Sequence, residues 1–453
     1  MRCYCSCGRS FRTAGGREDH QTAAKTNGSA PSRSLSGANY SLSIVNTSSN
    51  VVQAGNTTER SPLVKAKQQA WLWKQIRRPT QPVYIIVQSA IIPSTKAVTS
   101  EAGYQLVCSY NWQGGKPFKI RVPGHAAICQ DMSLPLTLQP DKGTYFIDLN
   151  AAMLPQHPFE PMFRAAYSMN PDASFDDVDI VTNRNSLRKL LDFSAGRSGD
   201  YFRLNLHLVR NTLIIERRWK RTREFIDDSR EKGWGKSFEE ASAQFPAGLE
   251  HSLGYHRTLR YSLGALSCAV QFEVDACFDS GSKPGPLDDL VPRMETVSIP
   301  CDQPGKAKGP QQGVQVETVY HGARVMDQST TAELKSTCSE KRIKQVMPQL
   351  WFGRTPWLIV GRHTNGTFDD VKITNVTEEF AEWEATKQEA LRKLVTLLEE
   401  LRTAIRRNGG RPCAAVLERR SGVIGVFDLM NNNQAVPADL RQKLWNRAPL
   451  PSW

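Results

Sequence analysis

LSCAVQFEVDACF, residues 266–278, is the stretch of sequence that decides the fold. Its β-branched and aromatic residues predict one continuous strand. Residues two apart in a strand share a face, so Glu273 and Asp275 should project to the same side. The opposite face would carry apolar residues only, namely Val270, Phe272, Val274 and Ala276. The stretch therefore predicts a sheet edge that presents two carboxylates to a cleft.

Strand-like and helix-like patterns alternate on both sides of this stretch. The other expected strands are 83–92, 104–112, 145–149, 178–182, 201–209, 212–219, 257–263, 314–320, 330–336, 357–362, 366–373, 413–418 and 423–429. The expected helices are 156–173, 184–193, 235–245 and 376–408. In the last of these, leucines at three- to four-residue spacing favour core packing over a partner zipper. The sum is an α/β (α+β) protein with a mixed β-sheet flanked by helices.

Composition divides the chain into a tail, one large domain and a second tail. Residues 1–68 are rich in Ser, Thr, Asn, Gly and Arg, and we expect a disordered basic N-terminal tail. The domain should span 69–430, with a Pro- and Gly-rich surface insertion at 279–312. Residues 431–453 are expected to form a C-terminal tail.

The chain is strongly basic, with a formal net charge of +13. Such an excess favours a polyanionic partner, because Lys and Arg displace counterions from phosphates. The simpler explanation is a basic tail on a neutral domain. Basic runs at 217–223, 341–344 and 402–411 show that the tail does not hold the whole excess.

Several features indicate an intracellular protein. The ten cysteines form no C-x-x-C pair, which favours reduced thiols and no zinc site. No apolar signal core or membrane-length apolar window occurs, so we expect no membrane association. RRWKRTR, residues 217–223, is an exposed basic turn, an RNA contact or a nuclear address. We expect a nuclear location over a cytoplasmic one.

Three short patterns carry the chemistry: GKSFE at 235–239, FEVDA at 272–276 and AELKS at 332–336. Glu333 and Lys335 share one face of their expected strand. If the two strands are adjacent, three carboxylates and one ammonium group form a cluster, which a divalent ion such as Mg²⁺ would stabilise. Taken alone, the E-x-D and E-x-K patterns are more typical of a solvated strand face than of a site. Their combination favours a metal-dependent site.

Two other enzyme classes fit poorly. GKS at 235–237 resembles the end of a P-loop, but the required glycine is Arg230. Paired aspartates occur without the D-D-x-x-D spacing of prenyl synthases. His251 and His256 have no evident partner, so a catalytic histidine is not expected.

In their order, these patterns resemble the motifs of the eukaryotic mRNA decapping nuclease and 5′-triphosphate RNA pyrophosphohydrolase (DXO-like) family, in a divergent fungal branch. IVTNRNSLRKLL at 180–191 is similar to the family's arginine motif, and MPQLWFGR at 347–354 to its glutamine motif. The matching residues are Arg184, Glu239, Glu273, Asp275, Glu333, Lys335 and Gln349. The chain departs from the family pattern at Lys236, at Asn185 and in the long gap before Glu333.

The resemblance implies a PD-(D/E)XK-nuclease-like fold and a site that uses Mg²⁺ or Mn²⁺. The implied catalytic residues are Glu239, Glu273, Asp275, Glu333 and Lys335. The implied metal ligands are Glu239, Asp275, Glu333, the Leu334 carbonyl and Glu273, the last through water. Arg184, Gln349 and Lys335 would bind the substrate, although Arg184 also fits a plain surface helix charge.

The implied activity is metal-dependent hydrolysis at RNA 5′ ends, by removal of pyrophosphate or a cap, by 5′→3′ exoribonuclease action, or by more than one of these. The alternative is a non-catalytic RNA-binding scaffold, or a partner of a 5′→3′ exoribonuclease, on the same fold. The intact carboxylate set favours the enzyme, because unused clustered carboxylates are an electrostatic cost.

Overall fold

The computed structural model describes residues 69–197, 199–227, 233–279, 314–318, 325–338 and 343–446. Residues from Trp71 onward fall in one compact unit, which holds every strand and α-helix discussed below. The other unit, built mainly from Arg12–Ala70, lies almost wholly outside the described residues. The tail expected at 1–68 and nearly all of the insertion expected at 279–312 also lie outside them.

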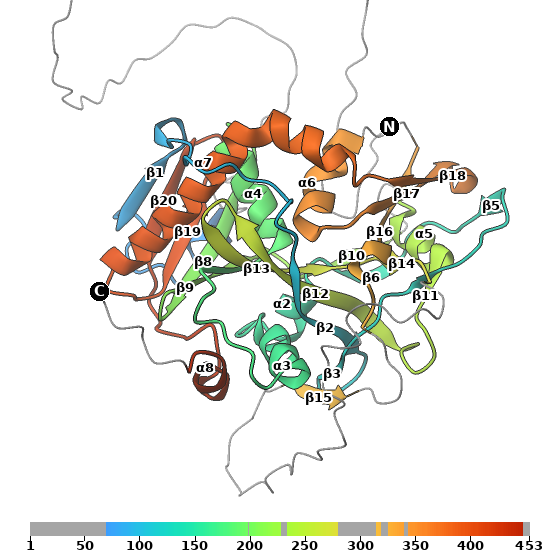
Figure 1. The fold of residues 1–453 in the computed structure, drawn as a ribbon, viewed down its shortest axis with the longest axis horizontal. Helices are drawn as coiled ribbons and strands as arrows, with labels where there is room; N and C mark the ends of the chain where they lie inside the picture. The colour runs from blue at the N-terminus through green and yellow to red at the C-terminus, as the bar shows by residue number, and fades with distance from the viewer. Residues whose placement is uncertain are drawn as a thin grey trace, which may run out of the picture. The chain divides into compact units, whose positions relative to one another are not determined.

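A mixed sheet of eleven strands is the main layer of the described residues (Figure 1). In spatial order its strands are β1 (Tyr84–Val87), β20 (Val423–Asp428), β19 (Cys413–Leu417), β8 (Phe202–Val209), β9 (Thr212–Arg218), β7 (Ile180–Asn183), β13 (Leu266–Glu273), β12 (Ser252–Leu263), β2 (Gln105–Gln113), β3 (Lys119–Val122) and β15 (Gln315–Thr318). The chain's most β-rich stretch forms β13, which pairs antiparallel with β12 and parallel with β7.

Helices cover both faces of this sheet. The helices are α2 (Leu149–Met153), α3 (Glu160–Met169), α4 (Arg184–Ser194), α5 (Gly235–Ser242), α6 (Ile343–Gly353), α7 (Glu379–Arg407) and α8 (Ala438–Leu444). α4 packs against α7 and α6 over one apolar core, while α3 and α8 pack over a second core on the other face. Leu391, Leu398 and Ile405 of α7 are fully buried, so the leucine stripe is core packing.

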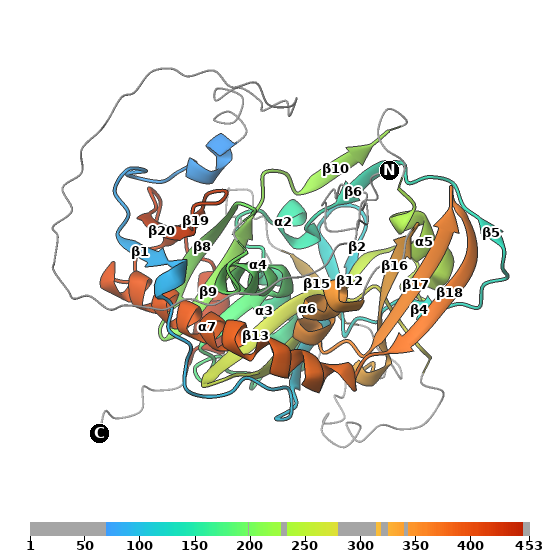
Figure 2. The same cartoon turned by 90° about the horizontal axis from the view of Figure 1, so that it is seen from above.

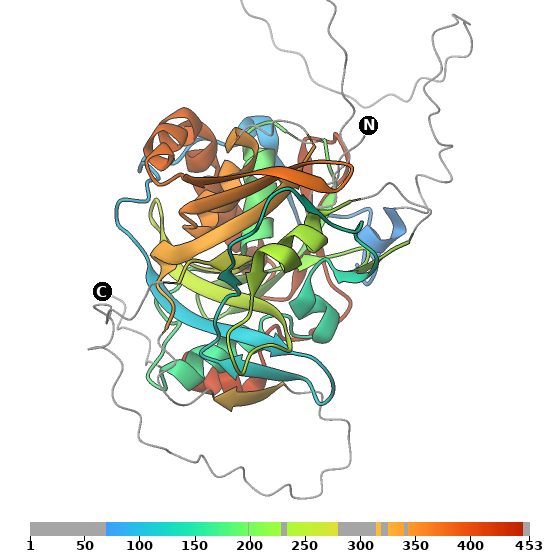
Figure 3. The same ribbon diagram turned by 90° about the vertical axis from the view of Figure 1, so that its right-hand side faces the viewer.

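A smaller sheet lies beside the large one, on the right in Figure 2, and Figure 3 looks onto it and α5. Its strands in spatial order are β11 (Ala243–Gln244), β4 (Ile128–Cys129), β14 (Ala276–Cys277), β16 (Thr331–Thr337), β17 (Trp357–Thr364), β18 (Thr367–Asn375) and β5 (Leu136–Thr137). A separate pair joins β6 (Gly143–Phe146) to β10 (Arg223–Ile226). Short 3₁₀ turns complete the elements at Ala70–Trp73, Gln88–Ala90 and Gln328–Thr330. The expectation of mixed sheets flanked by helices is confirmed.

The stretch 266–278 does not form the single strand that we expected. β13 ends at Glu273, and the chain then leaves the large sheet to pair as β14 with β16 of the smaller one. The backbone hydrogen bonds show the change of partner: the Val274 N–H still donates to the Tyr255 carbonyl of β12 at 3.1 Å, whereas Ala276 and Cys277 pair with β16. Glu273 and Asp275 therefore lie where the chain passes between two sheets, not along one flat edge.

The packed domain continues past residue 430, where we expected a tail to begin. Residues 431–446 include α8, and Leu440, Leu444 and Trp445 are buried against the α3 side of the sheet. The tail pattern was misleading because the apolar residues that anchor this segment are few and widely spaced.

In the described part of the chain, every helix is too short or too polar to cross a membrane. Five described cysteines are free thiols, namely Cys108, Cys129, Cys268, Cys277 and Cys413. Cys338 is disulfide-bonded, so the expectation of reduced thiols is wrong for that residue.

Candidate active site

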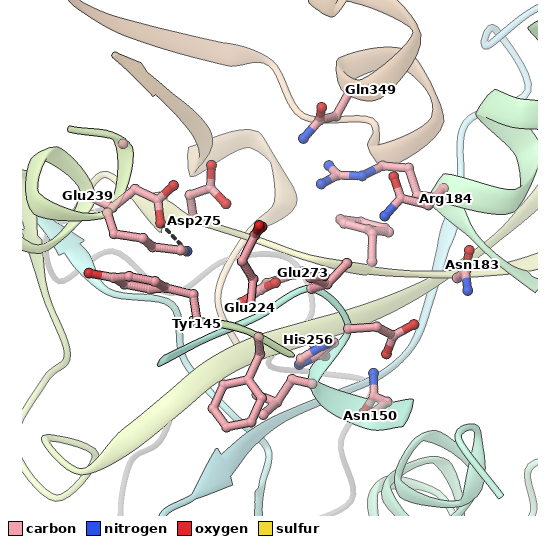
Figure 4. A pocket seen from close by; sticks show the side chains of 18 of the residues that line it. Tyr145, Asn150, Asn183, Arg184, Glu224, Glu239, His256, Glu273, Asp275 and Gln349 are labelled. Atoms are coloured by element: carbon pink, nitrogen blue, oxygen red, sulfur yellow. Dashed lines mark hydrogen bonds and ion pairs between the residues drawn. The ribbon is translucent and has the colours of Figure 1, made fainter. Parts of the chain in front are cut away.

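A cavity of about 660 Å³ opens between the two sheets, beside the end of β13 (Figure 4). Its walls come from the 141–150 segment, the start of α4, strand β10, the start of α5, strands β12, β13 and β16, and α6. The sequence-predicted residues that line it are Arg184, Glu239, Glu273, Asp275, Glu333 and Gln349. Lys335 touches this group without lining the cavity. Separate stretches of chain thus meet at one cavity.

The register of β14 with β16 brings the E-x-D and E-x-K patterns into contact. Ala276 pairs with Ala332, so the preceding Asp275 comes beside Glu333. The Leu334 backbone N–H donates to Asp275 Oδ2 at 2.9 Å. Lys335 Nζ lies 3.7 Å from the same carboxylate and donates to the Leu334 carbonyl at 2.9 Å. The carbonyl proposed as a metal ligand is therefore held by an ammonium group.

Glu333 is the centre of the cluster and is only 1% exposed. Lys335 Nζ and Gln349 Nε2 both donate to its Oε1, and Arg184 Nη1 donates to Oε2 at 3.3 Å. A buried carboxylate with three donors is fixed in position, and its charge is compensated.

Arg184 is the first residue of α4 and is held from several sides. The Asn183 side chain caps the helix by accepting from the Ser186 N–H at 2.8 Å. The Arg184 guanidinium carbon lies 5.4 Å from the centre of the Phe272 ring. One turn further on, Arg188 Nη1 donates to Gln349 Oε1 at 3.1 Å. The helix start thus presents two guanidinium groups to the cavity.

Glu239 reaches the cavity from α5. The Asp141 carboxylate accepts from the backbone N–H groups of Gly235 and Ser237, both at 2.9 Å, and so caps this helix. Glu239 Oε2 accepts from Lys236 Nζ at 2.5 Å. Side-chain capping and this ion pair fix the first turn of α5 at the cavity wall.

A glycine in β17 makes room for α5 against the smaller sheet. A Cβ at Gly361 of β17 would lie 2.4 Å from Phe238, which is fully buried and stacks on Phe368 at 4.9 Å between ring centres. Glycine at this position therefore allows the helix to approach closely enough for Glu239 to face the cluster.

Glu273 and His256 are cross-strand neighbours on β13 and β12. A Cβ at Gly254 would lie 2.8 Å from Glu273 Oε1, so glycine leaves the space that this carboxylate uses. The His256 ring stacks on Tyr110 with 5.2 Å between ring centres, and burial lowers its pKa to about 4. Within the described residues, its Nδ1 has no hydrogen-bond partner. His256 is thus a neutral imidazole at the cavity wall.

A buried polar network supports this wall. Asn150 Oδ1 accepts from Tyr110 Oη and Trp112 Nε1, both at 2.8 Å. Gln271 Nε2 donates to Tyr110 Oη at 2.9 Å. Because the buried groups satisfy one another, the wall is rigid and its polar atoms are fixed.

The pKa values of the cluster's two buried carboxyls, Asp275 and Glu333, are shifted in opposite directions. Burial raises the pKa of Asp275 well above its ordinary range, and Glu333 adds to this shift. Burial would also raise the pKa of Glu333, but Lys335 and Arg184 outweigh it and lower that pKa to about 2. Burial would lower the pKa of Lys335, but the charges of Glu333 and Asp275 outweigh burial and raise that pKa. Glu333 and Lys335 therefore form a charged pair, and Asp275 is the carboxyl that takes up a proton first.

The donor set fits a hard divalent cation. Glu239, Asp275, Glu333 and the Leu334 carbonyl offer only oxygen ligands, which suit Mg²⁺ or Mn²⁺. Gly254 leaves space for the Glu273 carboxylate at the same cavity wall. As they stand, however, no three acidic, histidine or cysteine side chains of the described residues converge closely enough to hold an ion. Ammonium groups now take the positions between the carboxylates, so a cation has to displace them.

The sequence missed several residues of the cavity. Tyr145, Asp148, Asn150, Arg188 and His256 also line it. Only Arg188 had a usable signal, because it lies four residues after Arg184 and so on the same helix face. The others reach the cavity through tertiary packing.

Comparison with solved structures identifies the class of fold. Scheffersomyces stipitis Rai1 in complex with (3′-NADP)⁺ and calcium ion matches with a TM-score of 0.51 and 13% identity, over 81% of this chain and 99% of that one. A mutant S. pombe Rai1 in complex with 3′-FADP matches with a TM-score of 0.50 and 10% identity, over 76% and 99%. These are decapping-nuclease structures, and the expected resemblance is confirmed at the level of the fold.

The chain belongs to a family described as a domain of unknown function (DUF8563), whose model matches residues 81–445. No curated protein matches the chain. At these low identities, the structural likeness establishes the fold alone.

Proposed function

We propose that this chain is a metal-dependent hydrolase that acts on RNA 5′ ends, by removing pyrophosphate or a cap, by 5′→3′ exonuclease action, or by both. The observation that carries the proposal is the convergence on Glu333. One buried carboxylate is bound by Lys335, Arg184 and Gln349 and lies beside Asp275, at the wall of a 660 Å³ cavity. These acids, the lysine and the arginine come from segments far apart in the sequence, so only the tertiary fold brings them together.

The proposed roles follow from the contacts. Glu239, Asp275, Glu333 and the Leu334 carbonyl would hold the cation, with Glu273 contributing through water. The bound cation would activate a water molecule and stabilise the charge that develops on phosphorus. Arg184 and Arg188 are placed to bind 5′ phosphates, since guanidinium groups match phosphate oxygens in geometry.

Lys335 and Gln349 complete this arrangement. Once released from the carboxylates, the Lys335 ammonium group would hold the transferring phosphate as a point charge. Gln349 bridges Arg188 and Glu333, so it couples the phosphate-binding helix to the proposed metal ligands. The calcium ion and dinucleotide bound to S. stipitis Rai1 support the proposal, because that protein shares this fold.

The test compares RNAs that carry a 5′ triphosphate, a 5′ monophosphate or a cap, each with Mg²⁺, with Mn²⁺ or with EDTA. We expect turnover of at least one RNA with a divalent metal only. Glu333→Gln and Asp275→Asn should each lower it at least about 100-fold, because each removes a charged ligand. The control is Glu389→Gln, which removes a 2.7 Å surface ion pair with Lys393 and should leave turnover unchanged. Equal turnover in all four proteins would exclude this site.

The second candidate is a non-catalytic RNA-binding scaffold or a partner of a 5′→3′ exoribonuclease. The observation that favours it is that Lys335 and Lys236 already neutralise carboxylates of the cluster. This function requires 5′-end binding that is unchanged by EDTA, with no turnover of any of the three RNAs.

A further inference from the structure

The first turn of α5 places a second lysine among the acids of the cavity. Lys236 lines the cavity, and its Nζ lies 2.5 Å from Glu239 Oε2, the contact drawn as a dashed line in Figure 4. The two residues are three positions apart on one helix, so their side chains lie on the same face. Glu239 is thus engaged by a cation that the chain itself supplies.

The charges around this pair come from more than Glu239. Burial would lower the pKa of Lys236, but Glu239, Glu273 and Asp275 outweigh it and raise that pKa. At the other end of the cluster, Lys335 and Arg184 form ion pairs with Glu333. The acids at both ends of the cluster are therefore paired with cationic side chains of the chain itself.

An ammonium group and a divalent ion compete for the same carboxylate oxygens. To bind an ion, Glu239 has to give up a short charge-assisted hydrogen bond, and the freed ammonium group then lies beside the incoming positive charge. Both effects oppose metal binding, and both arise from one side chain.

We propose that Lys236 is a built-in competitor of the divalent cation: its ammonium group holds the Glu239 carboxylate in the metal-free protein and thereby weakens the affinity of the site for metal. This inference rests on the proposed function, since it assumes that Glu239 is a metal ligand. A higher concentration of free metal is then needed to fill the site, because the cation has to displace the lysine from Glu239.

The test measures Mn²⁺ binding to the full chain, by calorimetry and by the spin-resonance signal of free Mn²⁺, without any RNA. Lys236→Met should bind Mn²⁺ about tenfold more tightly than the native protein, which corresponds to the loss of one charge-assisted contact. Lys236→Arg keeps the charge and should stay within about threefold of native. Lys236→Gln is a second neutral variant that should behave like Lys236→Met. Lys393→Met is the matched control, because it removes a surface lysine with a 2.7 Å ion pair and should change nothing.

A double variant separates competition from a general charge effect. In a Glu239→Gln background, Lys236→Met should no longer tighten Mn²⁺ binding, because there is no shared carboxylate to release. A full tenfold gain in that background overturns the inference, as does equal affinity of native protein and Lys236→Met. In both cases the proposed function survives if Mn²⁺ binds. If neither the native protein nor any variant binds Mn²⁺, the metal-dependent function fails together with the inference.

Discussion

The ammonium group of Lys335 lies 3.7 Å from the carboxylate of Asp275. Asp275 connects the large sheet to the smaller one, and Lys335 belongs to β16 of the smaller sheet. The contact exists because Asp275 precedes β14, which pairs with β16 at Ala276 and Ala332. Strand register, not sequence proximity, builds the charged centre of the cavity.

Removing Lys335 should expose the electrostatic cost of the cluster. Lys335→Met removes the ammonium group that both buried carboxyls contact and leaves Arg184 as the ion-pair partner of Glu333, so the free energy of unfolding should fall by about 3 kcal/mol. Chemical denaturation measures this loss. Added Mn²⁺ should restore more stability to Lys335→Met than to the native protein, because the ion replaces the missing charge. An unchanged unfolding free energy contradicts the buried ion cluster.

Arg184 should bind phosphate through its planar guanidinium group. Arg184→Lys keeps the positive charge but loses the forked geometry, so affinity for 5′-triphosphorylated RNA should fall about tenfold. Fluorescence anisotropy in EDTA measures binding without turnover. Arg197→Lys is the control, because Arg197 pairs with Asp192 near the other end of α4. Equal affinity of native protein and Arg184→Lys means that Arg184 serves only to hold Glu333.

Gly254 tests whether the position of Glu273 matters. A Cβ there would lie 2.8 Å from Glu273 Oε1, so Gly254→Ala should push this carboxylate aside. We expect metal-dependent turnover to fall about tenfold or more, as for residues that orient metal ligands, with little loss of stability. Gly114→Ala is the control, because its nearest neighbours would lie 3.8 Å away. If both variants keep native turnover, Glu273 has no role in the site.

The buried imidazole of His256 gives stability a defined pH dependence. Its pKa is about 4 in the folded protein and 6.5 in its ordinary state, so the unfolded chain takes up the proton more readily. Above about pH 6.5 this difference in pKa costs no stability, and the free energy of unfolding falls as the pH drops toward 4, by about 3 kcal/mol in all. Denaturation at pH 4.5 and 7.5 measures the difference. His256→Phe keeps the ring stacked on Tyr110 and should show a smaller pH dependence; an identical one contradicts the assignment to His256.

Sequence patterns located the acidic residues but not the shape that gathers them. The β-rich pattern around Phe272 identified the central strand correctly, because apolar alternation reports burial directly. It did not show that the strand ends at Glu273, because that end depends on whether β12 or β16 supplies the next backbone partner. Periodicity within one segment contains no information on that choice.

The polar wall of the cavity was missed for a related reason. Asn150 lies against Tyr110 and Trp112 through side-chain hydrogen bonds between distant segments. His256 looked like an isolated histidine, since its stacking partner is on the adjacent strand β2. Helical spacing, in contrast, was sufficient to predict α4 and α7, because residues three and four apart share a face wherever the helix lies.

Anomalous diffraction from crystals soaked with Mn²⁺ would locate the metal site itself. We expect a manganese peak within about 2.5 Å of carboxylate oxygens of both Asp275 and Glu333, with Lys335 displaced from at least one of them. A manganese peak elsewhere in the molecule, with Lys335 still paired to both carboxylates, would show that these acids do not form a metal site.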